Sequence, residues 1–352
     1  MPFLEQVLDD DPGPDRVTHS FADDAVEQLH GPGDSTPRAT PRLRLFSEDV
    51  PLAGLGPETL SVLAERRVEL LVAAPPERLD ALPRLAADAA AAGARLGVWP
   101  LLHEVAGRYP NADQLDAFER QARRAIQAIR LPAGAERGGS RRGPTVVMDL
   151  EPPVSLLRLR RPGPTAVARV ARWARGNLAR SGTARRRLTV LVDALRREGA
   201  GQVVATVLPV VRPVGVGRTL GSLLGTPIDG VPFDAVFPMA YTSLAEGYLP
   251  GLGRAGAERL LTQVVRRGGP AVALGIVGGG ALGDERPYRG PGELVRDVAL
   301  ARAGGAVDLA LHGLDGMWSQ EAGLDAAWLD AFVGAAVSRS PSPPAPGPGP
   351  AR

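Results

Sequence analysis

The sequence predicts an α/β fold, a single-domain (β/α)8 or TIM barrel, and three observations support this prediction. Short apolar runs rich in β-branched residues occur eight times along the chain. Stretches of helical periodicity follow most of these runs, which is typical of parallel strands joined by helices. The runs are apolar almost throughout, as expected for strands buried on both faces. A doubly wound open sheet usually has fewer strands and favours a glycine-rich phosphate turn, which is absent here.

The apolar runs and the helical stretches give the expected order of elements. Strands are expected at 42–49, 68–75, 95–102, 145–152, 202–210, 233–241, 271–279 and 307–318. Helices are expected at 57–66, 77–93, 111–130, 164–199, 255–267, 291–304 and 324–337. The segment 212–230 is rich in glycine, so it predicts a loop or a short turn rather than a helix.

The ends of the chain differ in composition from its middle. Residues 1–40 are rich in Asp, Pro, Gly and Thr and predict a flexible leader, whereas 339–352 predict a disordered Pro-rich tail. The barrel is therefore assigned to residues 41–338. No signal peptide and no membrane span are visible, so we expect a cytoplasmic location, or a secreted or cell-envelope one if the true start lies elsewhere.

Composition narrows the classes of function. The formal net charge is +2, which favours no nucleic-acid partner. The chain has no cysteine, which excludes disulfides, thiolate catalysis and thiolate zinc sites. His103 and Glu104 are adjacent and point apart on a strand, so they do not predict a metal site. We expect a monomer without a cofactor or a metal.

Polar and aromatic side chains gather where the expected strands end, the side of a (β/α)8 barrel that carries active sites. These strand ends hold Ser47, Glu48, Trp99, His103, Glu104, Asp149, Glu151, Met239, Tyr241, Thr242, His312, Asp315, Trp318 and Gln320. Flat aromatic faces suit the stacking of sugar rings. We therefore expect a polysaccharide or oligosaccharide substrate, with Trp318, Met239, Trp99, Glu48 and Gln320 as substrate-binding residues.

Asp149 and Glu151 in "TVVMDLEPP" (145–153) are the expected catalytic acids. Being two residues apart, they point to the same side of a strand, with Cα atoms about 6.6 Å apart. Two carboxyl groups so close cannot both ionise freely in a partly dry cavity, so the pKa of one rises. A carboxylic acid that stays protonated near neutral pH can act as a general acid.

Three motifs resemble those of family 18 glycoside hydrolases, the chitinase-like barrels. "MDLE" (148–151) resembles the end of their D-x-x-D-x-D-x-E strand-4 motif, "FPMAYTS" (237–243) their Met-x-Tyr-Asp motif, and "GLDGMWSQE" (313–321) their strand-8 segment. The resemblance implies that Glu151 is the general acid, Asp149 its orienting neighbour and Tyr241 the hydroxyl that steadies the acetamido carbonyl. It also implies that Trp318 floors the sugar site and that the substrate's acetamido oxygen is the nucleophile.

The sequence departs from the family pattern at three positions. Val147 and Pro144 stand where the earlier Asp residues of the strand-4 motif are expected, and Thr242 follows Tyr241 in place of an Asp. The Thr242 change is expected to weaken substrate positioning. The D-x-E pattern also occurs in the lysozyme-like family 25 hydrolases.

The sequence thus predicts a glycoside hydrolase acting on a chitin-like or peptidoglycan polymer, with Glu151 as the acid/base. Two alternatives stay open. One is a catalytically inactive carbohydrate-binding barrel. The other is a metal-assisted phosphodiesterase or isomerase that uses Glu48, His103, Asp149 and Glu151.

Overall fold

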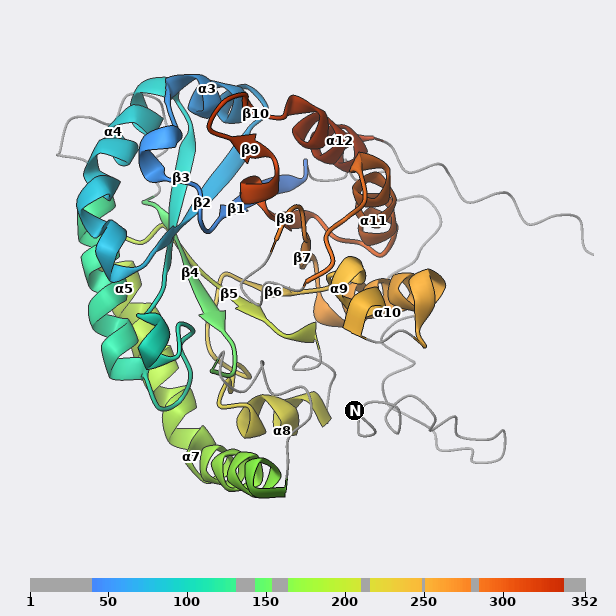
Figure 1. Cartoon of the computed structure of the whole chain (residues 1–352). Helices are drawn as coiled ribbons and strands as arrows, with labels where there is room; N and C mark the ends of the chain where they lie inside the picture. Colours follow the sequence, from blue (N-terminus) through green and yellow to red (C-terminus); the bar gives the residue numbers. More distant parts are fainter. Residues whose placement is uncertain are drawn as a thin grey trace, which may run out of the picture. The chain divides into compact units, whose positions relative to one another are not determined.

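The chain folds as a (β/α)8 TIM barrel. The structure, a computed structural model, describes residues 40–130, 143–153, 164–209, 216–248, 251–279 and 285–338. The expected leader up to residue 39 and the expected tail from residue 339 lie outside the described residues. In Figure 1 the helices surround the strands, as the strand–helix alternation of the sequence predicts.

Eight parallel strands of the described chain form the barrel wall. They are β1 (Arg42–Ser47), β2 (Val68–Ala74), β3 (Arg95–Pro100), β4 (Thr145–Leu150), β5 (Gln202–Val207), β6 (Ala235–Pro238), β7 (Ala271–Gly275) and β8 (Asp308–His312). Each lies within a predicted run and is shorter than it. The expected eighth run also contains Trp318, which belongs to a separate hairpin of β9 (Trp318–Ser319) and β10 (Gly323–Leu324).

The helices that cover the wall match the predicted stretches with two differences. They are α3 (Pro57–Glu65), α4 (Leu82–Ala92), α5 (Leu115–Ile129), α7 (Pro164–Arg197), α8 (Val216–Leu223), α9 (Thr242–Tyr248), α10 (Gly253–Gly268), α11 (Pro291–Ala303) and α12 (Ala326–Val337). The short helix α9 was not predicted. Among the described residues, no helix is both long and apolar enough to cross a bilayer.

The prediction of a loop or short turn over 212–230 is wrong in part, because α8 forms within it. This helix packs against α7. The side-chain amide of Asn177, in α7, donates to the carbonyl of Leu223 at 3.1 Å, at the last residue of α8. Gly225 follows with φ +72°, a conformation that glycine adopts without steric cost. Contact with α7 thus outweighs the weak helix propensity of a glycine-rich segment.

The strands are joined in the order β6-β5-β4-β3-β2-β1-β8-β7, so the ring closes between β6 and β7. There the structure has a parallel bridge between Met239 and Ala273. The amide of Ala240 also donates to the carbonyl of Ala273 at 2.9 Å. The pairing between β6 and β7 is shorter than that between β1 and β8, which runs over five residue pairs.

Two hydrophobic clusters lie on opposite faces of the strands. Leu43 and Leu45 of β1 belong to the larger cluster between the strands and the helices. Phe46 belongs to a smaller cluster inside the barrel, together with Trp99 and Phe237. Because side chains alternate along a strand, Arg44 and Glu48 share the inward face of Phe46.

Arg44 fills the barrel at the N-terminal ends of the strands. Its guanidinium is fully buried and pairs with both carboxylate oxygens of Asp308, at 2.9 and 3.1 Å. It also lies 3.1 Å from a carboxylate oxygen of Glu69 and donates to Gln202 at 2.9 Å. Thr145 donates to Glu69 at 2.6 Å. Buried charges are tolerated when they are paired and hydrogen-bonded in this way.

Replacing Arg44 tests whether this buried network supports the barrel. Arg44→Met leaves the carboxylates of Glu69 and Asp308 without their common cation, so we expect the free energy of unfolding to fall by about 3–5 kcal/mol. Urea denaturation followed by circular dichroism measures the loss. Arg84→Met is the control, since Arg84 lies on α4 outside this network and its side chain is 86% exposed. The control should cost less than about 1 kcal/mol; equal losses would contradict the assigned role of Arg44.

Candidate active site

The candidate site lies at the C-terminal ends of the strands. Asp149 is the fifth residue of β4, Glu151 directly follows that strand, and His312 ends β8. Glu48 comes directly after β1. All are placed by strand alternation on the inside of the barrel mouth, the end at which TIM barrels carry their chemistry.

Asp149 and Glu151 are buried together, with 3% and 8% of their surfaces exposed. The hydroxyl of Thr206, on β5, donates to a carboxylate oxygen of Asp149 at 2.7 Å. Burial raises the pKa of Asp149 to about 6 despite this hydrogen bond. Burial and the adjacent charge of Asp149 raise the pKa of Glu151 well above its usual range. At neutral pH the pair therefore holds a proton on Glu151 and a charge on Asp149.

Glu48 has the opposite electrostatic environment. Its carboxylate, 4% exposed, contacts the guanidinium of Arg108 and lies 3.5 Å from Nε2 of His312. Burial alone would raise its pKa, but the hydrogen bond and charge of His312, together with Arg108, lower that pKa to about 2. Burial alone would lower the pKa of His312. The hydrogen bond and the charge of Glu48 outweigh this effect, so the pKa of His312 is raised. Glu48, Arg108 and His312, here called the Glu48 cluster, thus hold an ionised carboxylate beside the acid pair.

Aromatic rings surround the Glu48 cluster. The Trp99 ring meets the Phe46 ring edge to face, with centroids 5.3 Å apart, and lies 5.8 Å from the His312 ring. The centroid of the Tyr241 ring lies 6.0 Å from that of the His312 ring. Gly275 of β7 makes room for this arrangement, since a Cβ there would lie 3.3 Å from both His312 and the Tyr241 ring.

Tyr241 is half-buried, and it packs with Met239 against the inner cluster. Burial and the charges of Asp149 and Glu151 raise the pKa of its phenol well above 10, so it remains a hydrogen-bond donor at neutral pH. The structure therefore brings five of the predicted residues together: Asp149, Glu151, Tyr241, Glu48 and Trp99. Met239 lines the inside of the barrel beside them.

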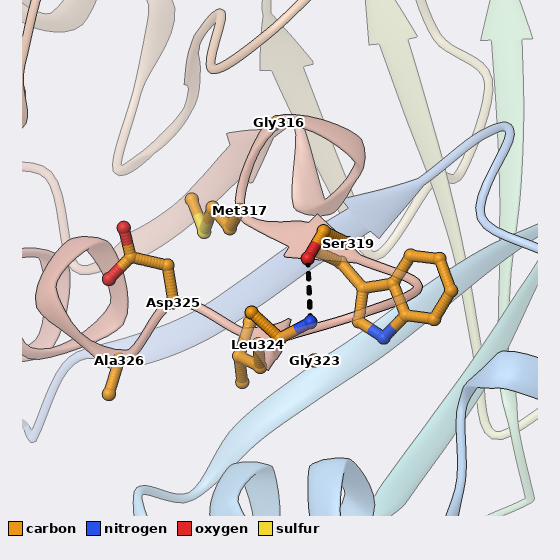
Figure 2. Close-up of a pocket in the computed structure, with 9 residues that line it drawn as sticks. Gly316, Met317, Ser319, Gly323, Leu324, Asp325 and Ala326 are labelled. Atoms are coloured by element: carbon orange, nitrogen blue, oxygen red, sulfur yellow. Dashed lines mark hydrogen bonds between the residues drawn. The ribbon is translucent and has the colours of Figure 1, made fainter.

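The structure does not place Trp318 and Gln320 with this group. The Trp318 ring packs on Gly54, where an added Cβ would lie 2.5 Å from it, and against the outer hydrophobic cluster. Gln320 is exposed in the turn of the β9–β10 hairpin. Residues 316–319 and 322–326, which include Trp318, line a separate pocket of about 510 Å³ (Figure 2). Trp318, which was predicted to form the floor of the sugar site, thus lies in this hairpin. The indole of Trp99 lies inside the barrel instead.

His103 is also outside the group. Its side chain is 62% exposed and lies 3.9 Å from Glu77, away from Asp149 and Glu151. The four residues of the metal-assisted alternative are therefore not brought together. Within the described ranges, no group of three or more His, Asp or Glu side chains is arranged to hold a metal ion.

Thr242 does not face the barrel mouth. Its side chain is buried and its hydroxyl donates to Asp297 of α11. Tyr288 donates to the same carboxylate oxygen at 2.8 Å, and Arg254 of α10 binds the other at 2.6 Å. The next residue, Ser243, donates to the carbonyl of Gly275 at 2.9 Å. Thr242 and Ser243 thus fasten the start of α9 directly after Tyr241, and the site holds no carboxylate at this position.

Arg108 and Tyr109 were missed by the sequence analysis. They lie in the loop after β3, beyond the strand end, where no periodicity marks them. Gly107 and Arg108 both have positive φ, +97° and +63°, and for Arg108 this conformation is uncommon. The only sequence signal is an arginine and a tyrosine in a loop on the active-site side of the barrel. His312 was identified as a strand-end residue but received no role.

No protein-family model matches the sequence, and neither does any curated protein. Solved structures that resemble the fold include the PgaB (BpsB) glycoside hydrolase domain from Bordetella bronchiseptica, at 14% identity and a TM-score of 0.43 over 79% of this chain and 95% of that one. A xylose isomerase domain protein from Alicyclobacillus acidocaldarius has 15% identity and a TM-score of 0.41, over 84% and 99%. D-psicose 3-epimerase has 12% identity and a TM-score of 0.43, over 84% and 96%. Likenesses at this level say nothing about the activity of the chain.

The acid pair gives stability a defined pH dependence. Both folded-state pKa values lie above the unfolded values, so the contribution of the pair to stability is complete below about pH 4. The part due to Asp149 is lost as pH rises through about 6, and the part due to Glu151 is lost at higher pH. Glu151→Gln mimics the protonated acid. The free energy of unfolding of Glu151→Gln, relative to that of the wild type, should therefore be about 1–3 kcal/mol higher at pH 8 than at pH 5. Urea titrations at both pH values measure this, with the exposed Glu65→Gln as control; a gain in both variants would contradict the assignment.

Introducing at position 242 the acidic residue of the family 18 motif should destabilise the fold. Thr242→Asp places a second carboxyl group against buried Asp297, so we expect a loss of about 2–4 kcal/mol in unfolding free energy. Thermal unfolding of Thr242→Asp and Thr242→Ser makes the comparison. The serine variant keeps the hydroxyl and should lose less than about 1 kcal/mol. A stable Thr242→Asp protein would show that this side chain can turn to the barrel mouth.

Proposed function

We propose that the chain is a glycoside hydrolase-like barrel that cleaves an N-acetylated polysaccharide, chitin-like or peptidoglycan. One observation carries this proposal: a protonated carboxyl, Glu151, and an ionised one, Asp149, are buried side by side at the barrel mouth. In glycosidases, the surroundings of two carboxyl groups give them different pKa values, so that one stays protonated as the general acid and the other stays ionised. The phenol of Tyr241 next to this pair agrees with the roles that the family 18 resemblance implies.

In the proposed reaction, Glu151 gives its proton to the oxygen of the glycosidic bond as that bond breaks. The acetamido oxygen of the substrate forms the new bond to the anomeric carbon, and Asp149 stabilises the positive charge that develops on the acetamido group. Tyr241 donates a hydrogen bond to the acetamido oxygen and orients it. Water then opens the intermediate and returns a proton to Glu151.

One observation favours a second candidate, a carbohydrate-binding barrel without turnover. Thr242 replaces the Asp expected after Tyr241, and its hydroxyl is committed to Asp297. A site that lacks this carboxylate would still bind a sugar through Tyr241 and Trp99, with the substrate's acetamido group less firmly held.

Glu151→Gln separates these candidates. Hydrolysis of the hexamer of β-1,4-linked N-acetylglucosamine and of peptidoglycan, followed by mass spectrometry of the products, should slow by a factor of about 100 or more because the proton donor is lost. Glu77→Gln, on an exposed carboxylate outside the site, should leave the rate unchanged. Full activity of Glu151→Gln would refute the acid role. Sugar binding by the wild type without any product would support the second candidate.

A further inference from the structure

The loop after β3 folds back over the barrel mouth at Arg108. The amide of Leu102 donates to the carbonyl of Arg108 at 2.9 Å, and the amide of Arg108 donates to His103 at 3.3 Å. A tight turn follows, in which the amide of Tyr109 donates to Gly107 at 2.7 Å. Arg108 stands in the left-handed region within this turn, which costs roughly 1 kcal/mol or more for a residue with a Cβ. Such a conformation persists only where surrounding contacts hold it.

One contact that holds the loop is the ion pair between Arg108 and Glu48. The side-chain amide of Gln114 also donates to the carbonyl of Ala106 in this loop. Glu48 is itself fixed from other sides. The carboxylate of Asp315 accepts the amides of Glu48, at 3.0 Å, and Val50, at 2.8 Å. The guanidinium of Arg78 binds the carbonyl of Glu48. Because Glu48 is anchored in this way, the ion pair sets the position of Arg108 and of the residue that follows it.

Tyr109 is that following residue, and its side chain enters the barrel. It is 6% exposed and belongs to the inner cluster with Phe46 and Trp99. Burial raises the pKa of its phenol, and the next largest cause is the charge of Glu151. The charges of Glu48 and Asp149 raise the pKa further, while Arg108 opposes them. The phenol therefore stays protonated, and its ring belongs to the inner cluster that also contains Val147 of β4, two residues before Asp149.

We propose that Tyr109 is a second substrate-binding tyrosine, whose hydroxyl donates to an oxygen of the sugar held at the acid pair, and that Arg108 positions it through Glu48. This inference depends on the proposed sugar substrate. A sugar offers hydroxyl, ring and acetamido oxygens as acceptors, and a phenol donor adjacent to the acid pair fixes the sugar relative to the Glu151 proton. Tyr109 touches the substrate, whereas Arg108 acts only by holding the loop.

The first test measures the contact with the sugar. In a Glu151→Gln background, which binds without cleaving, calorimetry with the N-acetylglucosamine hexamer should show that Tyr109→Phe weakens binding about fivefold or more, since it removes one hydrogen bond. His103→Gln lies in the same loop with an exposed side chain and should bind as the parent does. Equal affinity of the parent and Tyr109→Phe would overturn this inference alone. No binding by the parent would overturn the proposed function and the inference with it.

The second test needs no ligand. Arg108→Asn keeps a residue that tolerates positive φ and removes the guanidinium. Hydrogen–deuterium exchange of the full chain should become faster at 102–109 and stay unchanged in α3, while Arg108→Lys should restore part of the protection. Calorimetry on Arg108→Asn in the Glu151→Gln background should match the loss seen with Tyr109→Phe. Unchanged exchange at 102–109 would overturn the positioning role of Arg108.

Discussion

The ion pairing of Glu48 is the interaction on which the barrel mouth depends. A carboxylate that is 4% exposed costs several kcal/mol to bury unless cations compensate it, and Arg108 and His312 do so. These partners come from different parts of the chain, the loop after β3 and the end of β8. Asp315 and Arg78 hold the backbone of the same region. One charged side chain thus links the loop after β3 to the adjoining ends of β1 and β8.

Asp149 and Glu151 carry the same carboxyl group as Glu48, but the groups that surround them are different. Thr206 is a neutral donor to Asp149, and Glu151 has Asp149 as its close neighbour. No cation contacts either carboxylate among the described residues, so burial raises the pKa of both. Cations surround Glu48 and lower its pKa instead. At neutral pH one of the three carboxyl groups at the barrel mouth, Glu151, therefore keeps its proton while Asp149 and Glu48 are ionised, which is the condition for dividing proton donation from charge stabilisation.

Much of the fold could be predicted from the sequence, because strands buried on both faces leave long apolar runs. Asp149, Glu151 and Tyr241 could be identified because they interrupt or end such runs. Arg108 and Tyr109 could not, since their positions depend on a turn with positive φ and on a contact with distant Glu48. Trp318 has the expected place in the sequence, but the hairpin after β8 packs its ring on Gly54. Helix α8 required contacts with α7 that no local pattern contains.

The closure of the ring between β6 and β7 has a consequence for any ligand at the mouth. Tyr241 follows β6, while Gly275 ends β7 directly beneath the Tyr241 ring. The bridge between Met239 and Ala273 joins the two strands just below. A molecule held between Tyr241 and the end of β7 would span this junction and add its own contacts to it. By thermodynamic linkage, a change that stabilises the contact between β6 and β7 also strengthens the binding of such a ligand. Binding of the ligand in turn opposes separation of β6 and β7.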